Sequence, residues 1–303
     1  MPTYNHQEFI GAAIDSVLAQ DYENLEIVVG DDCSKDGTWG IVLDYRSRFP
    51  EVIKAFRNER NLGITGNCNE VLKRCTGRYI AFYAGDDLFS SGKIRKQVEI
   101  METDPLVVLC YHDVEVFNSQ TDETVRHWNH GPLSAVPLAG TANELAKAVV
   151  AKGTAFMAAL SVMVRADAVP ASGFDTRIPV ASDWMMWIEV LANAKQSAKV
   201  VFLNEVLARY RKHDSNVTST GDKYFSDVLT TLALVESNYP WLIEEVIDCQ
   251  AGLRYSRGIR FIRDGDFAGG RAYLVQSARA KMPSWMWLVW LAASYFPALR
   301  PRK

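Results

Sequence analysis

The sequence predicts an α/β protein with a mostly parallel sheet flanked by helices, followed by a helical C-terminal region. Three observations support this fold class. Apolar residues at helical spacing alternate with short β-branched runs through the first 220 residues. Polar turn residues follow several of those runs, as they do where parallel strands lead into helices. Beyond residue 220 the helical pattern continues alone, and 303 residues suffice for a substantial core.

The first 220 residues are expected to form helices and strands in alternation. Apolar residues between 8 and 19 recur at intervals of three and four, which predicts a helix, and the run 25–29 has the β-branched content of a strand. The remaining elements follow from the same two patterns. Further expected helices are 39–49, 66–75 and 184–192, and further expected strands are 52–56, 78–83, 107–111, 114–117, 156–164 and 199–203.

Two parts of the chain depart from this alternation. The polar stretch 118–140 has the composition of a long connection. After residue 220 only helices are expected, at 225–236, 242–263 and 267–280. We therefore divide the chain into an α/β domain (1–220), a helical region (221–281) and an apolar tail (282–303).

The tail is rich in tryptophan. Residues 282–299 contain no charge, and three of the eight tryptophans lie between 285 and 290. Pro283 and Pro297 bracket a segment that as a helix reaches about 20 Å, short of the roughly 30 Å of a hydrocarbon core. Tryptophan favours the headgroup layer, and the basic end at 300–303 suits anionic lipid. We expect an interfacial membrane anchor; a helix packed on the protein's own core is the alternative.

Composition excludes several classes of protein. The net charge of −3 offers no footprint for binding duplex nucleic acid. The five cysteines are scattered and form no CxxC pair, so neither a disulfide framework nor a zinc site is expected. The N-terminus shows no secretory signal. These features favour a cytoplasmic protein.

Two pairs of carboxylates follow expected strands. Asp86 and Asp87 offer adjacent oxygen ligands of the kind that Mg²⁺ or Mn²⁺ takes together with phosphate, although such pairs also form turns and cap helices. Asp31 and Asp32 repeat the arrangement. The ring of Tyr4 could stack on a base and Asp32 could accept a hydrogen bond from it; alternatively, Asp32 caps the helix that follows.

The order and spacing of these motifs resemble family 2 glycosyltransferases. The first block covers about 100 residues: PTYN (2–5), SVLAQ (16–20), EIVVGDD (26–32), DGT (36–38), NLG (61–63), GRYIA (77–81) and GDD (85–87). A second block resembles the family's downstream motifs: GFD (173–175), SDWMMW (182–187) and YRKHDSN (210–216). The resemblance implies a GT-A fold with a Rossmann-like sheet, a nucleoside-diphosphate sugar as donor, a divalent metal and inversion at the anomeric carbon.

The resemblance also implies roles for residues near the N-terminus. Thr3, Tyr4, Glu8 and Asp32 would hold the nucleotide, with Asp32 contacting the base. Asp86 would face the ribose or the sugar.

Three further residues would carry the chemistry. By the same resemblance Asp87 would bind the metal, His213 would bind the metal or the diphosphate, and Asp183 would be the general base. A metal offsets charge on a leaving diphosphate, and a carboxylate takes the proton of an attacking hydroxyl. Capping the helix 184–192 is the structural alternative for Asp183, and the two roles are compatible.

The sequence departs from the family pattern in two places. Ala84 stands where the family usually has an acidic residue. Relatives also have an apolar strand of about five residues before PTYN, where this chain has Met1 alone. Because a missing central strand would leave backbone unpaired, we expect the true start to lie upstream.

We therefore expect an inverting glycosyltransferase of the hexosyltransferase type, peripheral on the inner face of the cytoplasmic membrane. It would move a sugar to a hydroxyl of a glycan or lipid-linked acceptor in cell-surface polysaccharide synthesis. A sugar nucleotidyltransferase is an alternative, but the glycine-rich basic loop expected near its N-terminus is not seen. A catalytically inert nucleotide-binding or scaffold protein stays open.

Overall fold

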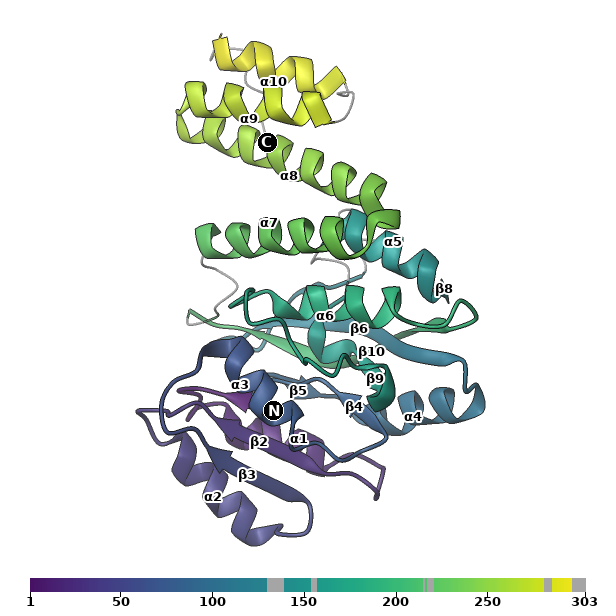
Figure 1. Cartoon of the computed structure of the whole chain (residues 1–303). Coiled ribbons are helices and arrows are strands. Elements are labelled where there is room, and N and C mark those ends of the chain that lie inside the picture. Colours follow the sequence, from purple (N-terminus) through teal and green to yellow (C-terminus); the bar gives the residue numbers. More distant parts are fainter. Residues whose placement is uncertain (130–138, 154–156, 215, 217–220, 281–284, 296–303) are drawn as a thin grey trace. The chain divides into compact units, whose positions relative to one another are not determined.

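The computed structural model describes residues 1–129, 139–153, 157–214, 216, 221–280 and 285–295. The chain divides into two compact units, Met1–Val149 with Thr154–Thr230, and Val150–Gly153 with Thr231–Lys303. The first unit contains every strand in the described part of the chain, and the second is helical (Figure 1). The domain boundaries at 220 and 281 remain a prediction.

The first sheet of the α/β unit is parallel throughout. Its strands, in spatial order, are β1 (Pro2–Thr3), β2 (Ile27–Asp31) and β3 (Ile53–Arg57). The helices beside it are α1 (Ile10–Leu18), α2 (Thr38–Arg48) and α3 (Gly63–Leu72). The strands β2 and β3 and the three helices are close to their predicted positions, whereas the two-residue strand β1 was not predicted.

Alternate residues of β2 face different helices. Ile27 and Val29 belong to one buried cluster with residues of α1 and α2. Gly30, on the opposite side, approaches α3, where a Cβ on this glycine would lie 2.6 Å from the Val71 side chain. The absence of a side chain at Gly30 therefore lets α3 pack directly against the strand.

The second sheet is mixed. Its path runs β4 (Tyr79–Ala81), β9 (Met163–Arg165), β6 (Val107–Asn118), β10 (Lys199–Lys212) and β5 (Leu88–Phe89), with β7 (Thr124–His127) on β6 and β8 (Gly140–Thr141) on β10. The long strands β6 and β10 pair in parallel, and the other pairs are antiparallel. The α/β class is confirmed, with the parallel pairing in the first sheet and in the centre of the second.

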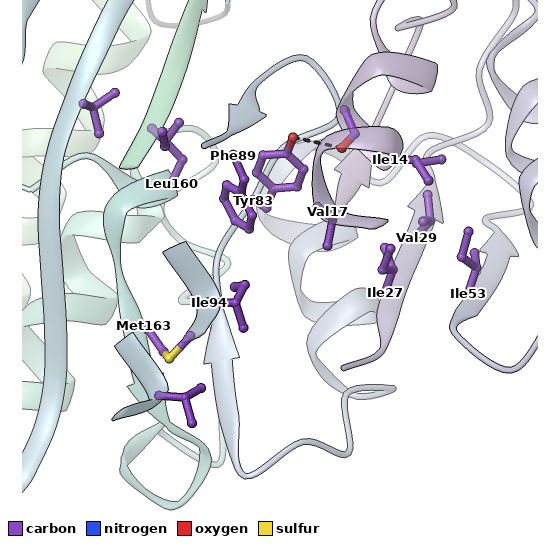
Figure 2. Close-up of a cluster of buried hydrophobic side chains, with 14 of the residues drawn as sticks. Ile14, Val17, Ile27, Val29, Ile53, Tyr83, Phe89, Ile94, Leu160 and Met163 are labelled. Atoms are coloured by element: carbon purple, nitrogen blue, oxygen red, sulfur yellow. Dashed lines mark hydrogen bonds between the residues drawn. The ribbon is translucent and has the colours of Figure 1, made fainter. Parts of the chain in front are cut away.

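A single core joins the two sheets (Figure 2). Its members come from β2, β3 and α1 on one side and from β5, α4 (Lys93–Thr103) and β9 on the other. Tyr83 lies where they meet: its ring is 4.0 Å from that of Phe89, and its hydroxyl donates to the Ala13 carbonyl at 3.1 Å. A buried tyrosine hydroxyl needs an acceptor of this kind. The hydrogen bond also fixes the position of Tyr83, three residues before Asp86.

Two helices of the second half complete the unit. In α6 (Ser182–Ala192) eight of eleven residues are buried, and the Trp184 indole donates to the Val149 carbonyl of α5 (Ala142–Lys152) at 3.0 Å. A helix that is apolar on nearly all sides belongs in a core. The first residues of α6 are therefore held firmly, which matters for Asp183.

The second unit is built from helices. After α7 (Gly221–Asn238), which begins in the first unit, come α8 (Ile243–Asp264), α9 (Phe267–Ala280) and α10 (Trp285–Tyr295). Gly265, with φ at +95°, ends α8 in the left-handed conformation that glycine adopts without strain. Within the described residues, no helix is both long and apolar enough to cross a bilayer.

Two sequence predictions need correction. The expected strand 156–164 is confirmed only at its end: a 3₁₀ turn lies at Ala159–Ser161, and β9 starts at Met163. A short apolar run does not distinguish a buried turn from a strand. The expected strand 199–203 continues to Lys212, and 107–111 and 114–117 are one strand, β6.

Candidate active site

Two loops interlock at the carboxyl edge of the first sheet. Two hydrogen bonds join the loop after β1 to the loop after β2. The Lys35 N–H donates to Asn5 Oδ1 at 2.8 Å, and the Asn5 N–H donates to Ser34 Oγ at 2.9 Å. Asn5 has φ of +54°, a conformation that asparagine tolerates better than most residues. The two loops thus form one rim where parallel strands end, the place where α/β proteins bind ligands.

Thr3 and Tyr4 begin this rim in different ways. Thr3 is buried, and its hydroxyl has no hydrogen-bond partner among the described residues. Gly85 lies against it, since a Cβ there would be 2.7 Å from Thr3 Oγ1. Tyr4 is 40% exposed, so its ring is free to receive a flat ligand.

Glu8 lines a polar cavity next to the rim. The cavity has a volume of about 490 Å³, and its lining comes from Asn5, residues 7–9, Asp36, 118–120 and 212–214. Glu8 and His213, which are far apart in sequence, therefore face the same space. This cavity is large enough for part of a nucleotide sugar.

Asp32 is buried and both of its carboxylate oxygens are in use. Oδ1 accepts the Leu62 N–H at 2.8 Å, and Oδ2 accepts the Gly63 N–H at 2.9 Å. Asn58 Nδ2 also donates to Oδ1, at 2.9 Å. Asp32 therefore holds the start of α3, whereas the start of α2 is capped by Asp36. The alternative that Asp32 caps the helix directly after it is wrong.

Asp86 follows β4 and faces two imidazoles. His213 Nε2 lies 3.1 Å from Asp86 Oδ2, and His6 Nε2 lies 3.9 Å from the same oxygen. Burial by itself raises the pKa of Asp86, but the His213 hydrogen bond and the nearby His6 hold that pKa below its usual value. The carboxylate is therefore ionised and lies between the loops that precede α1 and follow β10.

Asp87 is placed differently from its neighbour. It is buried, and its Oδ1 accepts the Arg211 N–H at 2.9 Å. The Arg211 guanidinium donates to the Asp86 carbonyl at 2.8 Å, so one arginine of β10 holds both residues. Burial and the adjacent Asp86 carboxylate raise the pKa of Asp87 well above its usual range. Asp87, the predicted metal ligand, is thus buried and bound by Arg211, whereas Asp86, the predicted sugar contact, keeps its carboxylate beside His213.

The residues present fit a divalent cation that shares its coordination with substrate. In the part of the chain that the structure describes, no three or more His, Cys, Asp or Glu side chains form a metal cluster. The Asp86 carboxylate and the His213 imidazole do lie side by side. Mg²⁺ and related cations are commonly held by one or two protein ligands, with phosphate oxygens and water completing the shell.

Asp183 is the second residue of α6. Its Oδ1 accepts the Trp184 N–H at 2.9 Å, and burial raises its pKa to about 6. A carboxylate with this pKa is ionised at neutral pH and is a stronger proton acceptor than an exposed aspartate. These properties suit a general base.

Helix α3 connects Asp32 with Asp183. Asp32 holds its first residues, and one turn further the Thr65 hydroxyl donates to the Ile178 carbonyl at 2.6 Å and lies 2.9 Å from Ser182 Oγ. Both carboxylates also raise the pKa of the Cys68 thiol on the same helix, although burial is the main cause of that shift. The two predicted site residues are thus joined through one helix.

Three residues of the site were not predicted. Arg211 belongs to the YRKHDSN motif, so its position in the motif was a usable signal, and His6 follows PTYN directly. The third, Asp227 of α7, has no signal in the sequence. Its carboxylate accepts the N–H groups of Val180 and Ala181, the residues that lead into α6. An acidic residue on an amphipathic helix looks like any solvated one in the sequence.

Comparisons with known proteins agree with the resemblance. Residues 1–169 match the family described as Glycosyl transferase family 2. The Escherichia coli enzyme named UDP-Glc:alpha-D-GlcNAc-diphosphoundecaprenol beta-1,3-glucosyltransferase WfgD is 36% identical over 121 residues, 40% of this chain and 46% of its own length. Alignments with several other curated relatives also cover about a third of their length.

Two solved structures share the fold. S. aureus TarS (1–349), in complex with UDP-GlcNAc, superposes with a TM-score of 0.66 at 16% identity, covering 98% of this chain and 86% of that one. The mannosyltransferase PcManGT from Pyrobaculum calidifontis, in complex with GDP-Man and Mn²⁺, gives 0.61 at 17%, covering 99% and 79%. The GT-A fold expected from the sequence is confirmed. With more than half of its length matched, the chain belongs to glycosyl transferase family 2.

Proposed function

We propose that this protein transfers a sugar from a nucleoside-diphosphate sugar to a hydroxyl of a glycan or lipid-linked acceptor, with inversion at the anomeric carbon. The observation that carries the proposal is Asp183, a carboxylate with a pKa of about 6 that α3 joins to the rim at Asp32. A single base held in this way suits a single displacement. Family membership supports the donor class.

In this proposal the rim holds the donor. Tyr4 stacks on the base, Asp32 shapes the base pocket through α3, and Thr3 supports the rim from behind, where it is buried against Gly85. Glu8 lines the cavity next to these groups. The UDP-GlcNAc and GDP-Man complexes of the two structural relatives support a nucleotide sugar, without deciding its base.

Asp86 and His213 are proposed to hold the diphosphate end together with Mn²⁺ or Mg²⁺. A bound divalent cation supplies positive charge that offsets the charge developing on the leaving diphosphate. Asp87, the ligand expected from the resemblance, would act from behind by fixing the loop through Arg211. The Mn²⁺ named in the PcManGT complex supports a divalent metal as part of this proposal.

Asp183 is proposed to take the acceptor's proton. As the hydroxyl oxygen attacks the anomeric carbon, the bond to the diphosphate oxygen breaks and its electron pair leaves with the nucleotide. The hydroxyl proton passes to the Asp183 carboxylate in the same step. The buried start of α6 keeps this carboxylate in place.

We place the reaction in cell-surface polysaccharide synthesis at the inner face of the cytoplasmic membrane. The name of the E. coli relative, a glucosyltransferase acting on a diphosphoundecaprenol-linked sugar, supports a lipid-linked acceptor. A second relative, from Bacillus subtilis, is named for teichuronic acid biosynthesis.

The experiment is release of nucleoside diphosphate from a panel of nucleotide sugars with Mn²⁺ or Mg²⁺. We expect metal-dependent turnover that falls by a factor of about 10²–10⁴ in Asp183→Asn. Asp167→Asn, at an exposed position in the same unit, is the matched control and should retain activity. No turnover of any donor, or full activity in Asp183→Asn, would contradict the proposal.

A further inference from the structure

Helix α10 uses only one side for packing. Trp290 and Ala293 are buried in a small core with Ile262 of α8 and Leu274 of α9. Trp287 also packs against this core and donates its indole N–H to the Leu274 carbonyl at 2.8 Å. These contacts orient the helix on α8 and α9.

The opposite side of α10 is apolar and exposed. Leu288 is 60% exposed and Tyr295 is 63% exposed, with the small Ala292 between them on the same stripe. The whole helix contains no charged residue. Large apolar side chains arranged in a stripe on an uncharged helix indicate a surface that contacts something other than water.

The net charge of this end of the chain indicates which partner the exposed stripe contacts. Residues 243–303, from the first residue of α8 onward, carry ten Lys and Arg against five Asp and Glu, a net charge of +5, whereas residues 1–242 carry −8. An acidic protein with one basic end has an electrostatic reason to bring that end to an anionic surface.

Two of these basic residues lie directly on the aromatic side chains of α10. The Arg263 guanidinium is 5.1 Å from the centre of the Trp290 ring, and that of Arg271 is 4.6 Å from the Tyr295 ring. Arg271 also donates to the Ser294 carbonyl at 2.9 Å. Tyr295 belongs to the exposed stripe, so Arg271 lies next to that stripe, whereas Arg263 covers the buried Trp290. Arginine beside an exposed tyrosine is typical of the headgroup level of a bilayer.

We propose that the unit α8–α10 docks on an anionic lipid bilayer, with the stripe Leu288–Ala292–Tyr295 in the headgroup layer and the arginines of α8 and α9 on lipid phosphates. The helix lies in the membrane plane. This proposal deepens the proposed function, because a lipid-linked acceptor is presented at that surface, but it rests on the second unit alone.

A second copy of the chain is the competing occupant of the stripe. Pairing of two copies of this unit would be opposed by their like net charges of +5, which a bilayer rich in anionic lipid instead neutralises. Charge therefore favours the membrane.

The test is co-sedimentation of the full-length protein with vesicles of phosphatidylcholine alone or mixed with phosphatidylglycerol. We expect binding to the mixed vesicles that decreases with salt. Leu288→Glu should weaken it by roughly tenfold or more, and the double variant Arg263→Gln/Arg271→Gln by several-fold to about 25-fold. Leu43→Glu, at an exposed leucine of α2, is the control and should bind like the unchanged protein.

Two results would overturn the proposal: equal binding to both vesicle types or to neither, or equal effects of Leu288→Glu and Leu43→Glu. A dimer in light scattering that Leu288→Glu dissociates would assign the stripe to a second copy instead. Donor hydrolysis without vesicles is measured in parallel. Because Leu288 is far in sequence from every residue of the site, intact hydrolysis with lost vesicle binding separates this proposal from the proposed function.

Discussion

Asp227 Oδ2 accepts the main-chain N–H of Val180 at 2.7 Å. The same oxygen accepts the main-chain N–H of Ala181 at 3.0 Å. Asp227 is buried on α7, and its two partners immediately precede the first turn of α6. The position of the proposed base Asp183 thus depends on a carboxylate 44 residues away in sequence.

Replacing Asp227 should lower the rate more than substrate binding. In Asp227→Ala the turn 180–181 loses its acceptor, and we expect kcat to fall by about tenfold to a hundredfold with KM nearly unchanged. Asp227→Asn keeps one acceptor oxygen and should recover part of the rate. Ser226→Ala, at the exposed neighbouring position, is the control and should keep the full rate. If Asp227→Ala lowered kcat only as far as it lowered the amount of folded protein, the effect would be merely structural.

The pH dependence of the reaction should report Asp183. A base works only when deprotonated, so kcat/KM should rise with pH and level off above about pH 6. Rate measurements from pH 5 to 8 in Asp167→Asn should show the same rise. A flat profile in the unchanged protein would argue against Asp183 as the base.

Asp183 should also make the stability depend on pH: its contribution to stability should fall as pH rises, whereas the rate should rise. Because its pKa is raised in the folded protein, the folded state binds a proton more tightly than the unfolded state, and this contribution is lost as pH rises through about 6. Asp183→Asn should therefore unfold at higher urea concentration than the unchanged protein at pH 7.5, by an equivalent of about 1–3 kcal/mol. At pH 4 the difference should largely vanish.

Asp86 and Asp87 should respond differently to loss of charge. Asp86→Asn removes the carboxylate beside His213, and we expect Mn²⁺ binding in the presence of a nucleoside diphosphate to weaken by roughly tenfold or more. Asp87→Asn keeps an oxygen that can accept the Arg211 N–H and should weaken binding less. Electron paramagnetic resonance of free Mn²⁺ measures both; the reverse order would restore Asp87 as the ligand.

Lys93 makes the stability depend on pH in the alkaline range. It is fully buried on α4, donates to Gln97 Oε1 at 2.6 Å, and has its pKa lowered by burial to about 7. Between this value and the unfolded value near 10.4 the unfolded chain binds more protons, so the contribution of Lys93 to stability rises with pH. Urea unfolding of Lys93→Met from pH 7 to 9 should lack this rise, which Lys73→Met, at an exposed site, should keep.

The sequence identifies most of the first sheet because each of its helices and strands carries its own periodic pattern. It does not show that β6 is one strand, because the polar residues His112 and Asp113 interrupt the apolar run although both are buried. The Asp113 carboxylate accepts the Asn129 N–H, a partner that only the folded chain supplies.

The site divides in the same way. Motif order identifies Asp86 and Asp87, but which of the two lies beside His213 depends on the backbone hydrogen bond that Arg211, more than 120 residues further on, donates to Asp87. The motif EIVVGDD identifies Asp32 in the sequence, but it does not show that Asp32 binds the first residues of α3. Long-range contacts of this kind leave no local pattern in a single sequence.

The attachment of α3 at both ends has a mechanical consequence. The helix begins on the carboxylate of Asp32, and its Thr65 reaches the residues beside Asp183. A shift of α3 as a unit moves the proposed base pocket and the proposed proton acceptor together. Under the proposed function, changes that widen this pocket for another base also alter the geometry of proton transfer, so donor preference and turnover change together.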